Sequence, residues 1–107
     1  MTKYNEDFTT ISAEVMGKIA KKVDELDCDP VFICRLNNHP EDYDNLFMVI
    51  GKYNTPHRYF DGQYAVWTAS LFGDNASLCY GHYHVSFKSA LEIVSERITD
   101  QNEREEI

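Results

Sequence analysis

The chain has 107 residues, enough for one domain around one core, and it contains no apolar run long enough to cross a membrane. Its formal net charge is −8, which disfavours nucleic acid and anionic membranes as partners and favours a basic protein surface. The first residues lack the apolar segment of a secretion signal, and the three cysteines lack a Cys-x-x-Cys spacing. We therefore expect a cytoplasmic protein with reduced thiols.

Apolar residues at three- and four-residue intervals predict an amphipathic helix of about five turns near the N-terminus. They are Phe8, Ile11, Val15, Ile19, Val23 and Leu26. Asn5 is a candidate N-cap, and Thr10 or Ser12 would serve if the helix begins later. Gly17 lies inside this helix, where glycine costs up to about 1 kcal/mol against alanine. A glycine there would let a neighbouring element approach the helix closely.

Four β-rich runs follow, separated by connections rich in Asn, Asp, Gly and Pro. Their expected bounds are 31–36, 46–51, 64–72 and 77–85. The second run is apolar on both faces, which indicates a central strand. In the fourth, strict alternation would place Leu78, Tyr80, His82 and His84 on one face. In the third, it makes Ala65, Trp67, Ala69 and Leu71 the natural core row.

Ser86 is a candidate cap for a second helix, and residues 99–107 lack periodicity. The apolar stripe of that helix would be Phe87, Leu91, Val94 and Ile98. We expect a single domain over residues 1–98 followed by an acidic, frayed tail. The predicted fold class is α+β: a helix, a four-stranded antiparallel meander and a helix, with both helices on one face of the sheet. The core on that face would comprise Trp67, Val15, Ile19, Val23, Leu91 and Val94.

Two patterns point to possible enzyme chemistry. His82 and His84 would extend from the same side of a strand, a spacing that suits zinc. Further ligands of suitable type are Cys34, His39 and His57. A thiol nucleophile at Cys34 or Cys79 is the other pattern, but both lie in apolar strands where burial keeps a thiol protonated. The more favoured interpretation has no catalytic residue, no bound metal and no cofactor.

Carboxylates cluster between residues 24 and 44, where seven acidic residues stand against one arginine. They fall in two groups, and neither has the regular spacing of ligands found in a calcium-binding loop. The second group surrounds a tyrosine that is suited to anchoring an interface. The predicted partner-binding residues are Asp24, Glu25, Asp27, Asp29, Glu41, Asp42, Tyr43 and Asp44. An alternative partner face consists of Tyr80, His82 and His84. A plain solubilising role for the acidic residues is the competing interpretation.

The block from residue 64 to residue 98 resembles small proteins of bacterial plasmids, prophages and phages. The resemblance rests on a Tyr-x-Val-Trp strand, a short turn, a Gly-His-Tyr strand and an acidic helix, and it covers about a third of the chain. Here these residues are Tyr64, Val66, Trp67, Gly81, His82, Tyr83, Ala90, Leu91 and Glu92. Lys88 and Ser89 depart from the pattern, which has more acidic residues in the helix.

Small size and acidity within that class resemble anti-CRISPR and other anti-defence inhibitors. The resemblance implies a non-enzymatic protein that covers the basic nucleic-acid-binding surface of a host defence enzyme, such as a CRISPR effector nuclease. It implies no direct contact with nucleic acid and none with membrane. The alternatives are a small metal- or thiol-dependent enzyme using His82, His84 and a cysteine, and a housekeeping interaction module.

Overall fold

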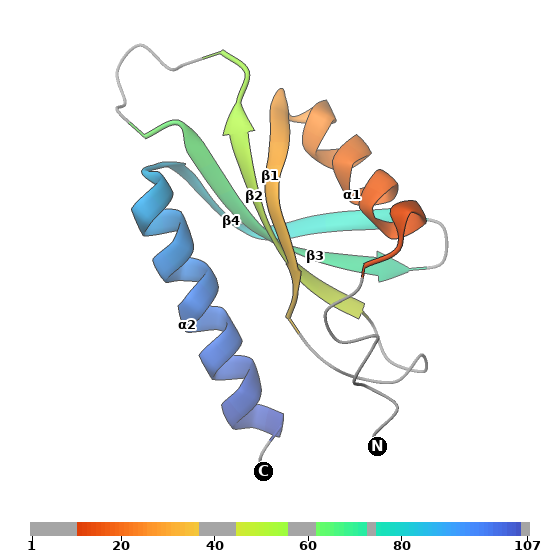
Figure 1. The fold of residues 1–107 in the computed structure, drawn as a ribbon, viewed down its shortest axis with the longest axis vertical. Coiled ribbons are helices and arrows are strands. Elements are labelled where there is room, and N and C mark those ends of the chain that lie inside the picture. Colours follow the sequence, from red (N-terminus) through yellow and green to blue (C-terminus); the bar gives the residue numbers. More distant parts are fainter. Residues whose placement is uncertain (1–10, 37–44, 56–61, 73–74, 106–107) are drawn as a thin grey trace.

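The computed structural model describes residues 11–36, 45–55, 62–72 and 75–105. Its elements are helix α1 (Ala13–Glu25), strands β1 (Cys28–Arg35), β2 (Asn45–Tyr53), β3 (Tyr64–Phe72) and β4 (Asn75–Val85), and helix α2 (Phe87–Glu105). The strands form one antiparallel sheet in the order β1-β2-β3-β4 (Figure 1). The predicted α+β class, with a helix, a four-stranded meander and a helix, is confirmed.

Helix α1 begins at the later of the predicted caps. The backbone N–H of Val15 donates to Ser12 Oγ at 3.2 Å, and Ser12 itself has an extended backbone. The earlier candidate cap Asn5 lies outside the described residues. The helix ends where Asp27 adopts a left-handed backbone with φ of 60°, which turns the chain directly into β1.

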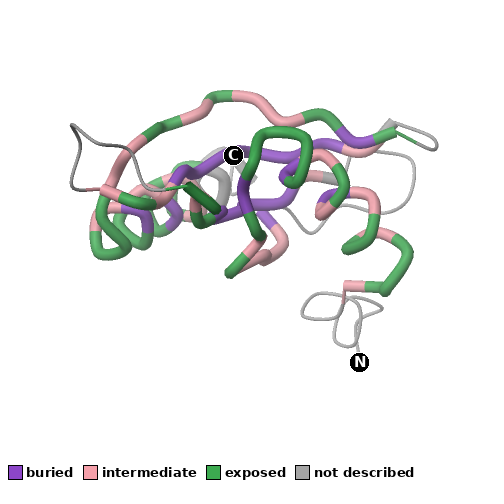
Figure 2. Tube along the Cα trace, turned by 90° about the horizontal axis from the view of Figure 1, so that it is seen from above, coloured by how far each residue is buried: buried purple, intermediate pink, exposed green. Residues whose placement is uncertain are grey.

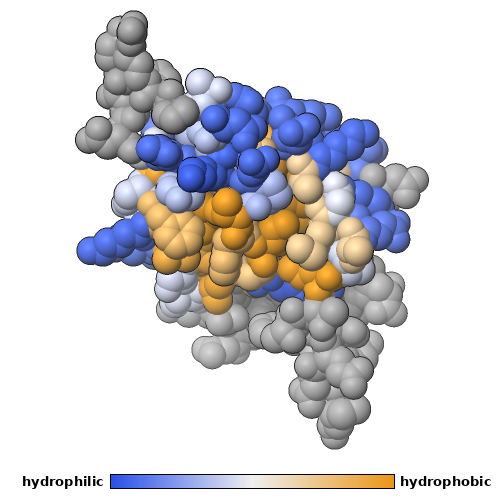
Figure 3. Space-filling model, turned by 45° about the horizontal axis from the view of Figure 1, so that its top comes forward, coloured by the Kyte–Doolittle hydropathy of each residue, from blue (hydrophilic) through white to orange (hydrophobic). Residues whose placement is uncertain are grey.

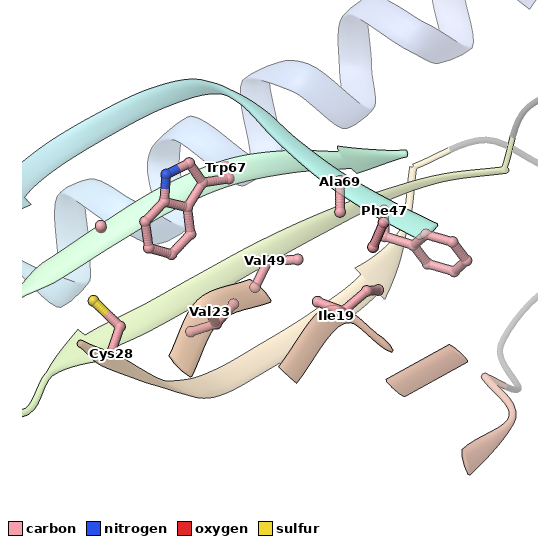
Figure 4. Close-up of a cluster of buried hydrophobic side chains, with 9 residues drawn as sticks. Ile19, Val23, Cys28, Phe47, Val49, Trp67 and Ala69 are labelled. Atoms are coloured by element: carbon pink, nitrogen blue, oxygen red, sulfur yellow. The ribbon is translucent and has the colours of Figure 1, made fainter. Parts of the chain in front are cut away.

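The two helices lie on opposite faces of the sheet, so the prediction that both cover one face is wrong (Figure 1). One buried layer joins Ile19 and Val23 of α1 to Phe47, Val49 and Trp67, together with smaller side chains (Figure 4). The other joins α2 to the opposite face of the same two central strands. Its buried members are Leu36, Met48, Ile50, Val66, Ala90 and Val94.

The physical reason for two layers lies in the central strands. Side chains alternate between faces, and both faces of β2 and β3 carry large apolar residues, so each face needs its own cover. Most of the buried residues belong to β2 and β3. Figure 2 shows the buried residues running through the middle of the molecule. Trp67 is 1 % exposed beneath α1, as predicted. Val94 belongs instead to the α2 layer, and Leu91 is 40 % exposed.

Strand β4 departs from regular alternation at two points. The residues opposite Tyr64, Val66 and Thr68 of β3 are Val85, His82 and Cys79 of β4. Between these pairs, β3 advances by two residues while β4 advances by three. Each extra residue makes a β-bulge, and two bulky residues of β4 adopt left-handed backbones, Tyr80 with φ of 53° and His84 with φ of 56°. The predicted grouping of alternate β4 residues on one face therefore fails.

Helix α2 is capped as predicted, because the backbone N–H of Ser89 donates to Ser86 Oγ at 3.1 Å. It continues to Glu105, so residues 99–105 extend the helix where we expected a frayed tail. The added residues include Glu, Gln and Arg, which extend a helix readily once it is nucleated. Arg97 links α2 to the sheet by donating to Thr68 Oγ1 at 2.8 Å and to the carbonyl oxygen of Tyr80 at 2.6 Å. Neither described helix is long and apolar enough to span a membrane.

Candidate partner-binding surface

Four of the predicted carboxylates gather where α1 turns into β1. We call Asp24, Glu25, Asp27 and Asp29 the acidic corner; all four are exposed. The turn is fixed by Asn54 at the end of β2. Its backbone N–H donates to the carbonyl oxygen of Asp27 at 3.0 Å, and its side-chain amide donates to Asp27 Oδ1 at 3.3 Å. One backbone and one side-chain hydrogen bond from Asn54 therefore hold the turn of the acidic corner in a defined shape.

The electrostatics of the acidic corner are unfavourable to the fold itself. Asp24 and Glu25 occupy the last turn of α1, where the helix dipole favours cations. Lys22 offsets part of this charge, with its Nζ 3.6 Å from a carboxylate oxygen of Glu25. The field also reaches the buried thiol of Cys28: burial, and then the charges of Asp27 and Asp29, raise its pKa to about 11.

The second predicted acidic group is not placed. Glu41, Asp42, Tyr43 and Asp44 lie outside the described residues. They belong to the connection between β1 and β2, which leaves β1 at the end opposite the acidic corner. From Cys28 to Arg35, β1 advances by seven residues of about 3.3 Å each, so its two ends are roughly 23 Å apart.

The histidine pair does not form the same-side arrangement on which the alternative of a metal-dependent enzyme depends. His82 lies opposite Val66, whose side chain belongs to the α2 layer, so His82 extends to that face. The ring of His84 stacks on Tyr53 with centroids 4.8 Å apart, and Tyr53 packs against the α1 layer. The bulge between the two histidines separates them. Across the described part of the chain, no three His, Cys, Asp or Glu side chains are grouped so that they could hold a metal ion.

The thiols occupy structural positions. Burial raises the pKa of Cys34, as it does that of Cys28, so both remain protonated at neutral pH. The thiol of Cys79 donates to the carbonyl oxygen of Thr68 at 3.3 Å. Burial lowers the pKa of Arg97, and the electrostatic effect of Cys79 offsets part of that lowering. This group joins α2 to the first bulge of β4.

Tyr80, on the alternative face, is the most exposed large hydrophobic residue in the described part of the chain. It is 76 % exposed, although its backbone is in a conformation that costs a bulky residue free energy. Tyr83 has a partner in the fold: its hydroxyl accepts from Trp67 Nε1 at 3.3 Å. Its ring also lies over Gly81, where an added Cβ would be 2.4 Å from the Tyr83 hydroxyl. Of the predicted face, Tyr80 and His82 are presented to solvent, and His84 is half-buried.

A further surface feature was not predicted from the sequence. An open groove of about 350 Å³ runs between α1 and β1, and we call it the apolar groove. It is lined by Met16, Gly17, Ala20, Pro30, Val31, Phe32 and Ile33. Figure 3 shows hydrophobic residues gathered in the middle of one face of the molecule, with hydrophilic residues above them and on both sides. The one sequence signal for this groove is a glycine inside an amphipathic helix.

The apolar groove and the acidic corner adjoin each other. Asp24 follows Ala20 by four residues, so it lies on the same side of α1 one turn further on. Asp29 precedes Pro30 in β1, but it lies opposite Lys52 and extends to the other face of the sheet from Cys28. An apolar depression with carboxylates at one end is a surface that can bind a protein segment.

No family model, curated protein or solved structure matches this chain.

Proposed function

We propose that this chain is a non-enzymatic binding protein that covers a basic, nucleic-acid-binding surface of a partner enzyme, in the manner of anti-CRISPR inhibitors. The observation that carries the proposal is the acidic corner: four exposed carboxylates in a turn fixed by Asn54. A surface shaped to bind phosphates also binds carboxylates, because both are oxyanions that accept from Lys and Arg.

The placement of these charges favours a role in binding over a role in solubility alone. Solubility requires only net charge, and any exposed position would supply it. Asp24 and Glu25 instead stand where the helix dipole opposes them, and Asp27 stands in a left-handed turn. Residues kept at a local cost to stability are typical of functional surfaces.

The arrangement of potential catalytic groups supports a non-enzymatic protein. His82 and His84 extend to different faces, and Cys28 and Cys34 are held as protonated thiols. Exposed ion pairs contribute little each, so an inhibitor of this kind also needs apolar or aromatic anchors. Tyr80 and the apolar groove supply them on the described surface.

The test is inhibition of DNA cleavage by guide-loaded CRISPR effector nucleases, measured at low and high salt. In the binding variant, Asp24, Glu25 and Asp29 are changed to Lys together; Asp27 is kept because it holds the turn through Asn54. The matched control reverses the same number of exposed charges on α2, with Glu92, Glu96 and Asp100 changed to Lys.

We expect wild type to inhibit a susceptible nuclease less at high salt, because screening weakens attraction between exposed charges. The corner variant should lose inhibition, and the α2 control should keep it. If the corner variant inhibits as well as wild type with the same salt dependence, the acidic corner is not the binding surface. If no CRISPR effector is inhibited by wild type, the proposed class of partner is wrong.

A further inference from the structure

We infer that the apolar groove is a docking site for a partner segment in which an apolar anchor side chain stands beside Lys or Arg. The anchor enters the groove between α1 and β1, and the basic side chains reach the acidic corner at its end. This inference rests on the proposed function, because it names the segment of the basic partner that this surface recognises.

The described residues that line the groove are all uncharged, in a chain of which 26 % of residues are charged. Met16 is 44 % exposed and Val31 is 46 % exposed, one on each side of it. A contiguous exposed apolar area rimmed by polar residues is typical of an interaction site. Its size suits one or two side chains of a protein segment.

Gly17 indicates that something approaches α1 at this point. A Cβ built on Gly17 would meet no atom of the described residues within 4 Å, so the described part of the fold does not require a glycine there. Glycine nevertheless destabilises a helix relative to alanine. By contrast, a Cβ on Gly51 would lie 2.9 Å from the Trp67 ring, which shows why that glycine is needed internally. The open position at Gly17 gives a partner backbone room to come close.

The charges around the groove select the occupant. Asp24 lies one turn beyond Ala20 at one end of the groove, so it attracts a segment with a basic residue next to its anchor. A second copy of this chain would bring its own acidic corner and a further charge of −8. Addition of a partner strand along β1 is hindered by Pro30, which has no N–H, and by the shift of register between Pro30 and Phe32.

The experiment uses amide NMR of the full chain with a short synthetic helical peptide that carries leucines on one face and arginines beside them. Two control peptides replace the arginines with glutamates or the leucines with serines. We expect only the first peptide to bind, with shift changes at Gly17, Val31 and Ile33 that decrease at high salt. Gly17→Leu, which fills the groove with a good helix former, should weaken binding by about tenfold or more.

Ser95→Leu is the matched control, since it adds the same side chain at an exposed position of α2. It should bind the peptide like wild type. Three results would each overturn the inference. They are chemical-shift changes that lie away from the groove, binding of the glutamate peptide as tight as that of the arginine peptide, and peptide binding by Gly17→Leu as tight as by wild type. So would a wild-type dimer that Gly17→Leu converts to monomer, since a second copy would then be the occupant.

The two proposals fail in distinguishable ways. If Gly17→Leu keeps full nuclease inhibition and peptide binding, the groove inference falls while the proposed function stands. If Gly17→Leu abolishes peptide binding but reversal of the acidic corner leaves nuclease inhibition unchanged, the groove is a docking site and the proposed covering of a phosphate-binding surface falls.

Discussion

Gly17→Ala should stabilise this protein, although it alters the wall of the proposed binding groove. The added methyl group meets no atom of the described residues within 4 Å and Gly17 is helical, so the packing between the described elements is not disturbed. The expected gain is the difference in helix propensity, about 0.8–1.0 kcal/mol. For a domain of this size it raises the melting temperature by roughly 4–8 °C. Urea unfolding followed by circular dichroism measures this gain in stability. The urea concentration at the midpoint of unfolding should rise, while the dependence of the unfolding free energy on urea should stay the same.

Gly51→Ala makes the same chemical change with the opposite sign, and it serves as the control. Its Cβ would lie 2.9 Å from Trp67 Cζ3 and 3.1 Å from the Cβ of Cys28, both in the buried α1 layer. Overpacking of this kind costs about 1–3 kcal/mol. If Gly17→Ala lowers the urea midpoint, or Gly51→Ala leaves it unchanged, the packing of α1 and β2 described above is refuted.

Three further changes test the core, the bulge and the buried thiol. Trp67→Ala should cost about 3–5 kcal/mol, enough to unfold most of the protein; a wild-type urea midpoint would contradict the buried indole. Tyr80→Gly should leave the urea midpoint equal or higher, because glycine adopts φ of 53° freely and the lost side chain is exposed; a clear fall would show that Tyr80 is not strained. The folded protein raises the pKa of Cys28 from 9.0 to about 11, so wild type should lose stability as the pH rises from 9 towards 11. Cys28→Ala should lose less stability over this pH range, because it has no thiol to ionise. If thermal unfolding of the variant and of wild type depended on alkaline pH in the same way, the raised pKa of Cys28 would be contradicted.

The sequence predicts the elements well because their signals are local. Strand β3 has the bounds expected from its alternation, and both helix caps are among the serines proposed. The placement of the helices is not local. An apolar stripe shows that a helix must be covered, but it does not say by which face of the sheet. The signal that would have decided it is the apolarity of β2 on both faces, with Phe47 and Val49 on one side and Met48 and Ile50 on the other.

The candidate site is predictable in part. The residues of the acidic corner follow from composition, and their exposure from their charge. The separation of His82 from His84 does not follow from the sequence. A bulge moves every later residue of the strand to the opposite face, and only Gly81 marks the position of the bulge. The apolar groove exists only after α1 has packed beside β1, so residues far apart in the chain form it. Gly17 gave the single local sign of it.

Competition with DNA tests most directly whether this protein covers a nucleic-acid-binding surface. The measurement is fluorescence anisotropy of labelled target DNA bound to a guide-loaded CRISPR effector that wild-type protein inhibits, with the protein titrated at several DNA concentrations. The account predicts displacement of the DNA, with an apparent inhibition constant that rises as DNA is added, and weaker displacement by the variant with Asp24, Glu25 and Asp29 changed to Lys. A stable complex of protein, effector and DNA, with inhibition independent of DNA concentration, would contradict it.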